Sequence, residues 1–259
     1  LAARLAARLG APPAGEGSWG PPAGAADLAA ADRALPCLGR LLPLLASLPC
    51  FWALFDQQGS SWVLQARAMD RAGVLPGGWE VSPETIQILN PIFVIVLIPM
   101  VARLFERWPR QLGRPPGPLS RINAGMLAAA LAFACSAAVQ VLVDRSPAGS
   151  VPVLLQLPQI FLLTLAEVLV SVQSLDYFYG AAPAEAKSVV TALLFLTNSA
   201  GGLLCGLLYQ VLSPHFGAAQ LLLTFAALML AVVLLFARAT AHAEEADGGG
   251  SGRANTAPP

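Results

Sequence analysis

VPVLLQLPQIFLLTLAEVLVSVQSLDYFY, residues 151–179, is the stretch that decides the fold class of this chain. It exceeds the length of about 20 apolar residues that a helix needs to cross a bilayer. Glu167 is the only ionisable residue between Val151 and Leu175. Because a charge at membrane depth costs about 3 kcal/mol on insertion scales, such residues usually line a substrate or ion path. The stretch therefore predicts a membrane-spanning helix with a functional carboxylate.

The composition extends this prediction to the whole chain. Of its 259 residues 56% are hydrophobic and only 12% are charged, whereas soluble domains carry about 25% charged residues. Further apolar segments occupy 38–64, 86–104, 123–143, 188–211 and 218–237. Runs of this length in lipid exclude open strands. We therefore expect an all-α membrane protein with six transmembrane helices.

The segments on either side of the apolar spans indicate the domain boundaries, and the basic residues indicate the orientation of the chain in the membrane. Residues 1–34 are rich in Pro, Gly and Ala and read as a flexible lead-in, 35–240 form the bundle, and 241–259 are expected to be a disordered tail. Twelve Lys and Arg residues fall on one side of the predicted spans and three on the other. The positive-inside rule then places both termini in the cytosol.

Several chemical functions are disfavoured. The net charge is zero, so no attraction to nucleic acid is expected. The four cysteines lack CxxC spacing and the two histidines lie far apart, which argues against a metal site. Nucleotide-binding, nucleophile-elbow and zinc-protease motifs are absent from the sequence. We expect no cofactor other than a proton gradient, and a transporter rather than an enzyme.

The first span contains FWALFDQQGSSW, residues 51–62. In a continuous helix Trp52, Asp56 and Gly59 share one face. A carboxylate at membrane depth can exchange a proton when its charged form is poorly solvated. Asp56 is therefore a candidate proton carrier; the alternative is a carboxylic acid that bonds a neighbouring helix and never titrates.

Polar residues also mark the second and fourth spans. Asn90 precedes Pro91 and offers both a donor and an acceptor. Glu167, Ser171 and Ser174 repeat at i, i+4 and i+7 and so form a polar helix face. Such a negative face would attract an ammonium group. The alternatives are an interhelical clasp for Asn90 and a packing role for Glu167.

The backbone pattern predicts bends and a close helix contact. Proline pairs interrupt three spans at 43 and 49, 91 and 99, and 152 and 158, where they are expected to kink the helices. Gly202 and Gly206 form a GxxxG pair beside Gly201, which predicts close approach of another helix.

Three segments together resemble the proton-coupled oligopeptide transporter family of the major facilitator superfamily. They are FWALFDQQGSSWVLQA (51–66), QILNP (87–91) and PQIFLLTLAEVLVSVQSLDYFYGAAPAEAKS (158–188), and with span order the resemblance covers about residues 36–240. It implies that the six helices are helices seven to twelve of a twelve-helix transporter. A six-helix N-terminal half is then the missing partner.

The resemblance also implies roles for individual residues. Glu167 matches the glutamate that holds the amino terminus of the peptide, Asn90 contacts the peptide near that end, and Ser171 lies one turn beyond the glutamate. Trp52 matches a residue that lines the cavity. Asp56 matches an acidic position linked to proton coupling and gating.

Some positions depart from the family pattern. Arg40 matches a basic residue that pairs with an aspartate at the end of helix eight, but that aspartate position is Ala102 here. Leu194 stands where a pocket tryptophan is usual. The loop at 144–150 is short, so a large extracellular domain is not expected.

The resulting expectation is proton-coupled symport of di- and tripeptides by alternating access, in the plasma membrane or an endolysosomal membrane. Leu194 motivates one alternative, transport of another small solute such as nitrate, an amino acid or a metabolite. The missing half and the start at Leu1 motivate another, a non-transporting membrane fragment or scaffold.

Overall fold

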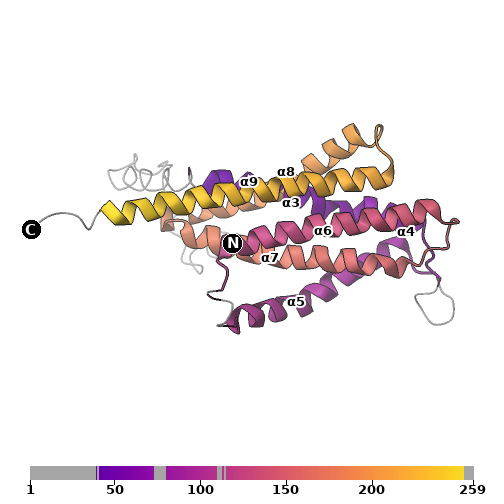
Figure 1. Cartoon of the computed structure of the whole chain (residues 1–259), viewed down its shortest axis with the longest axis horizontal. Coiled ribbons are helices and arrows are strands. Elements are labelled where there is room, and N and C mark those ends of the chain that lie inside the picture. Colours follow the sequence, from indigo (N-terminus) through magenta and orange to yellow (C-terminus); the bar gives the residue numbers. More distant parts are fainter. Residues whose placement is uncertain (1–38, 40, 73–79, 110–112, 114, 254–259) are drawn as a thin grey trace, which may run out of the picture.

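The computed structural model describes residue 39 and residues 41–72, 80–109, 113 and 115–253, without the side chains of Glu185 and residues 242–253. The described part is an elongated helical bundle (Figure 1). Its helices, with 3-10 segments labelled η, are α3 (Leu48–Phe55), η1 (Asp56–Gly59), α4 (Ser61–Arg67), η2 (Pro83–Ile88), α5 (Leu89–Glu106), α6 (Pro118–Arg145), η4 (Val153–Gln156), α7 (Leu157–Ala181), η5 (Ala184–Ala186), α8 (Lys187–Leu212) and α9 (Ala218–Arg253). The all-α fold class is confirmed.

Five helical stretches of the described part are long and apolar enough to cross a membrane. They are Pro83–Glu106, Pro118–Arg145, Val153–Ala181, Lys187–Leu212 and Ala218–Ala241, and each contains one of the predicted spans or nearly all of it. The predicted lead-in over 1–34 lies outside the described residues. At the other end α9 continues to Arg253, so the tail expected to be disordered from residue 241 is helical as far as Arg253. Alanine and glutamate between residues 241 and 246 favour helix there.

The first predicted span, 38–64, is not a continuous helix. Residues 41–45 are helical, a turn follows, and α3 begins with Pro49 in its first turn. After α3 the chain tightens into η1 and reaches Ser60 at φ −125° and ψ −80°, outside helical geometry, before α4 begins. Glycine and serine at 59–61 have weaker helix propensity than the leucine and alanine around them, which explains the break. The single helical face expected for Trp52, Asp56 and Gly59 is therefore interrupted.

Several prolines of the described residues lie in the first turn of a helix. Pro158 lies in the first turn of α7 and Pro83 in that of η2, where a missing backbone N–H costs nothing. Pro99 lies well inside its helix, α5. Pro158 thus lies where the 3-10 segment η4 passes into α7, rather than within a regular helix.

The core lies around α6, which packs along both α7 and α9 (Figure 1). Small residues permit this approach: a Cβ atom on Gly125 would lie 2.8 Å from Val170 Cγ2 and 2.9 Å from Leu169 Cβ. Alanines 129 and 132 of α6 are fully buried. Two further packing contacts, α3 against α8 and α5 against α7, complete the bundle and place the candidate functional residues.

The close contact expected at the GxxxG pair is displaced by one residue. Gly201 of α8 is buried, and a Cβ there would collide with Trp52 Cβ and lie 2.9 Å from the Pro49 carbonyl oxygen. A Cβ on Gly206 would meet nothing within 4 Å. Gly201 therefore provides the approach between α8 and α3, and Gly206 does not.

Candidate functional site

Asn90 and Glu167 form a hydrogen-bonded pair between α5 and α7. Asn90 Nδ2 donates to Glu167 Oε2 at 3.0 Å and to Thr164 Oγ1 at 3.2 Å. Thr164 is fully buried and donates its own hydroxyl to the Ile160 carbonyl at 2.8 Å. Because the amide group has two hydrogens, both are used and its orientation is fixed. The structure thus brings together two residues that the sequence analysis singled out separately.

Each residue of this pair keeps one side-chain oxygen that is free to accept hydrogen bonds. Among the described residues, Asn90 Oδ1 and Glu167 Oε1 accept no hydrogen bond, and both side chains are half-buried. The ion pairs between described residues, Arg67–Glu84 and Arg71–Glu80, do not involve Glu167. An amide oxygen beside a carboxylate is an arrangement that can accept the three N–H donors of an ammonium group.

Ser171 and Ser174 extend the polar face of α7 by two turns. Ser171 is half-buried, whereas Ser174 is buried and its hydroxyl oxygen has no hydrogen-bond partner among the described residues. The face predicted from the i, i+4, i+7 spacing is therefore continuous in α7, a regular helix from Leu157 to Ala181.

Trp52 and Asp56 lie on a different part of the bundle, where α3 and η1 contact α8. Trp52 is half-buried, with its ring 5.1 Å from that of Phe51 and 5.7 Å from that of Phe55. Asp56 is exposed at the surface of the described bundle, and its Oδ2 would lie 3.3 Å from a Cβ on Gly202. The helix break at η1 places Asp56 against α8 rather than α7.

Gln57, the residue after Asp56, is a site component that the sequence analysis missed. Its side chain is 1% exposed. Its Nε2 donates to Cys205 Sγ of α8 at 3.3 Å, and its Oε1 accepts from the hydroxyls of Ser60 and Ser61. Gln57 therefore holds the broken segment of the first span against α8.

A buried cluster of glutamines was also missed. Gln65 of α4 donates to the Ser136 carbonyl at 3.0 Å and to Gln140 Oε1 at 3.1 Å, both on α6. Its Oε1 accepts from Gln156 at 2.9 Å and from Gln159 at 3.0 Å. The four glutamines are all at least 93% buried. Their only sequence signal is the presence of amides within apolar spans, which does not reveal that they converge.

The remaining predicted positions are placed as follows. Arg40 lies outside the described residues. Ala102 lines a cavity of about 370 Å³ between α5, α6 and α7. Leu194 is half-buried on α8 and packs against the hydrophobic core. Among the described residues no group of three or more His, Cys, Asp or Glu side chains could hold a metal ion.

Comparison with known proteins relates this chain to peptide transporters and solute carriers. A sequence model of the POT family matches residues 33–242. The chain is 36% identical over 117 residues to "Peptide transporter family 1" of Drosophila melanogaster and 40% identical over 108 residues to "Solute carrier family 15 member 2" of Homo sapiens. These alignments cover 45% and 42% of the chain but only 15% and 14% of the relatives.

Solved structures match this chain over a longer stretch. The crystal structure of an auto-inhibited POT family peptide transporter superimposes with a TM-score of 0.71 at 30% identity, covering 82% of this chain and 42% of that protein. The POT family transporter PepTSo superimposes with a TM-score of 0.72 at 26% identity, covering 83% and 43%. The chain thus spans less than half the length of the relatives that it matches.

Proposed function

The chain belongs to the POT family and is a multi-pass integral membrane protein, and on that premise we propose that it forms the C-terminal half of a proton-coupled symporter of di- and tripeptides. The other half would be a six-helix N-terminal bundle that closes the transport path from the opposite side. Alternating access then requires the two halves to rock around a shared site.

The Asn90–Glu167 pair is the observation that supports this proposal. Glu167 is a carboxylate in a membrane-spanning helix without an ion-pair partner among the described residues. Its charge costs about 3 kcal/mol at membrane depth, and a peptide ammonium would offset that cost. Asn90 Oδ1 and Glu167 Oε1 would accept the ammonium hydrogens while Ser171 extends the polar surface. Trp52 would line the same transport path from α3, at the contact of α3 with α8.

Asp56 is the proposed proton carrier. It is exposed at the break between α3 and α4, a position from which it can meet water or the partner half. Proton uptake removes one negative charge from this surface and changes its attraction to any basic group opposite. Arg40, near the start of the first predicted span, is the proposed gating residue. Both termini of the chain are assigned to the cytosol by its distribution of basic residues.

Two alternatives are tested beside this proposal. Leu194 stands where the family pattern has a pocket tryptophan, and this difference favours a solute other than a peptide. The second alternative is a non-transporting membrane scaffold. Competition by dipeptides against uptake of nitrate and amino acids separates the first alternative, and absence of any proton-driven uptake would support the second.

The decisive experiment is dipeptide uptake into liposomes by the proposed twelve-helix transporter that contains this chain. Glu167→Gln keeps the side-chain shape but removes the charge, so we expect uptake to fall at least about tenfold through weaker peptide binding. Asp176→Asn is the matched control, because Asp176 is an exposed carboxylate on the same helix. Equal uptake by the Glu167 variant and the control would show that Glu167 does not bind the ammonium group.

A further inference from the structure

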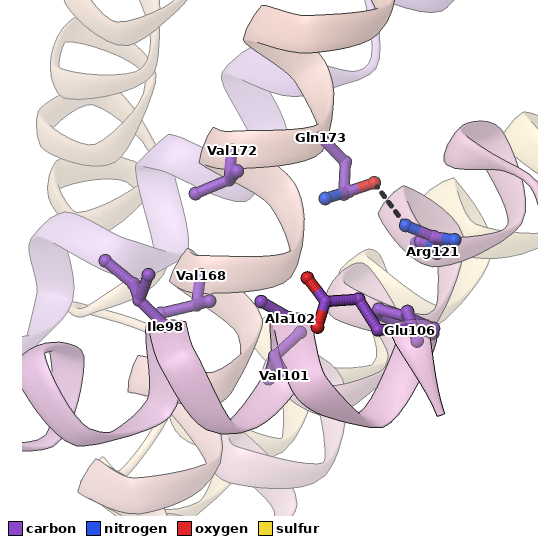
Figure 2. Close-up of a pocket in the computed structure, with 9 residues that line it drawn as sticks. Ile98, Val101, Ala102, Glu106, Arg121, Val168, Val172 and Gln173 are labelled. Atoms are coloured by element: carbon purple, nitrogen blue, oxygen red, sulfur yellow. Dashed lines mark hydrogen bonds between the residues drawn. The ribbon is translucent and has the colours of Figure 1, made fainter. Parts of the chain in front are cut away.

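A cavity whose lining includes neither Asn90 nor Glu167 lies at the end of the bundle where α5 ends and α6 begins (Figure 2). The cavity has a volume of about 370 Å³ and lies between α5, α6 and α7. Its polar lining consists of Glu106, Arg121 and Gln173, and its apolar lining of Ile98, Val101, Ala102, Phe105, Val168 and Val172. This division into a charged end and an apolar wall suggests an amphipathic ligand.

Arg121 is held rigidly but keeps free donors. Its Nε donates to the Pro116 carbonyl at 2.8 Å and its Nη1 to Gln173 Oε1 at 3.2 Å. The guanidinium carbon lies 3.8 Å from the centre of the Phe105 ring. Among the described residues Nη2 has no acceptor, so the half-buried cation still presents N–H groups to the cavity. Fixed guanidinium groups of this kind bind phosphate well.

Glu106 supplies the opposite charge at the same end of the cavity. Figure 2 shows its carboxylate on α5, near Arg121 and Gln173. The ion pairs formed between described residues do not include Glu106 with Arg121, so more than 4.0 Å separates their charged atoms. A cation and an anion that are close but unpaired match a zwitterion with its own two charges separated.

The apolar wall runs from this charged end into the membrane span. From Glu106 back to Ile98 is two turns of α5, about 12 Å. Ile98 and Val172 are 44% and 45% exposed, while Val101 and Val168 beneath them are buried. All three helices are candidate membrane spans. A lipid acyl chain would cover these apolar side chains, whereas a small soluble zwitterion would leave them uncovered.

We propose that this cavity is a binding site for a phospholipid whose headgroup carries a primary ammonium, as in phosphatidylethanolamine. The phosphate is held by Arg121, the ammonium by Glu106, and one acyl chain lies along Ile98, Ala102 and Val172. Phosphatidylcholine is disfavoured because its methylated nitrogen cannot donate hydrogen bonds to Glu106. Phosphatidylglycerol is disfavoured because it has no cation and is repelled by the carboxylate.

The test is native mass spectrometry of the full chain in detergent, with the three lipids added separately and carrying identical acyl chains. We expect phosphatidylethanolamine to be retained about fivefold more than the other two, the size of one partly exposed ion pair. Glycerophosphoethanolamine, the same headgroup without acyl chains, should not displace it. Displacement by this compound would show that the site takes a free zwitterion and would overturn the lipid proposal, as would equal retention of all three lipids.

Variants distinguish the site from general lipid adhesion. Arg121→Gln should lower retention of phosphatidylethanolamine, and Glu106→Gln should remove its advantage over phosphatidylglycerol. Ala102→Phe fills the cavity from an exposed position and should block every lipid. Arg107→Gln is the control, because Arg107 is an exposed arginine that directly follows α5 and does not line the cavity. If the Arg121 and Glu106 variants behave like this control while keeping the thermal transition of the parent chain, the proposal is wrong.

Discussion

Asn90 Nδ2 lies 3.0 Å from Glu167 Oε2, although the two residues are 77 positions apart in the chain. The hydrogen bond connects α5 with α7, and Thr164 fixes the same amide group from one turn away. An amide held in this way presents its oxygen in one direction only. The pair is therefore a preorganised acceptor site, which saves the cost of orienting the groups when a ligand binds.

Asn90→Leu removes this acceptor while keeping a similar side-chain volume. A hydrogen bond to a charged group contributes about 1.5–3 kcal/mol, so the peptide affinity of the reconstituted transporter should fall about tenfold or more. Equilibrium binding of a labelled dipeptide measures the change. Asn198→Leu, at an exposed position on α8, should leave affinity unchanged. Unchanged affinity in the Asn90 variant would remove Asn90 from the ligand site.

Gly201→Ala should destabilise the contact between α3 and α8. The added Cβ would meet Trp52 Cβ and the Pro49 carbonyl, and backbone atoms cannot rotate away as a side-chain tip can. Overpacking of this kind costs about 1–3 kcal/mol, which should lower the midpoint of thermal unfolding in detergent. Gly206→Ala has open space and is the matched control. Equal midpoints for the two variants would contradict the close approach at Gly201.

Gln65→Leu should disrupt the buried glutamine cluster. The substitution leaves donors on Gln156 and Gln159 and an acceptor on Gln140 without their partner. Each buried unsatisfied polar group costs about 1–3 kcal/mol, although Gln156 keeps its bond to the Trp62 carbonyl. We expect a lower midpoint of thermal unfolding than in the parent chain. Gln210→Leu, at an exposed position on α8, tests whether any loss of an amide has the same effect.

The spans and the polar face of α7 could be predicted from the sequence because they depend on local composition and helical period. The length and hydropathy of 151–179 are sufficient for α7, and the spacing of Glu167, Ser171 and Ser174 is sufficient for its polar face. The resemblance to a transporter family then pointed to Asn90 as a companion of Glu167.

Features that depend on contacts between helices could not be predicted in the same way. The break at η1 depends partly on Gln57, whose side chain bonds both Cys205 on α8 and the two serines at the start of α4. The sequence shows three candidate glycines, Gly201, Gly202 and Gly206. Only the position of Trp52 on α3 reveals that Gly201 is the one in close contact with α3. The glutamine cluster likewise joins Gln65 to residues more than 70 positions away.

Asp56→Asn should separate proton coupling from peptide binding. The amide keeps the shape of the side chain at the η1 break but cannot gain and lose a proton. Because Asp56 contacts α8 and lies outside the Asn90–Glu167 hydrogen bonds, peptide exchange between two equilibrated compartments should continue. Accumulation driven by an inward proton gradient should be lost. Paired measurements of counterflow and gradient-driven uptake in the same liposomes resolve the two effects, with Asp176→Asn as the control for loss of an exposed carboxylate. If the Asp56 variant still concentrates peptide when the gradient is applied, the proton is carried by another group.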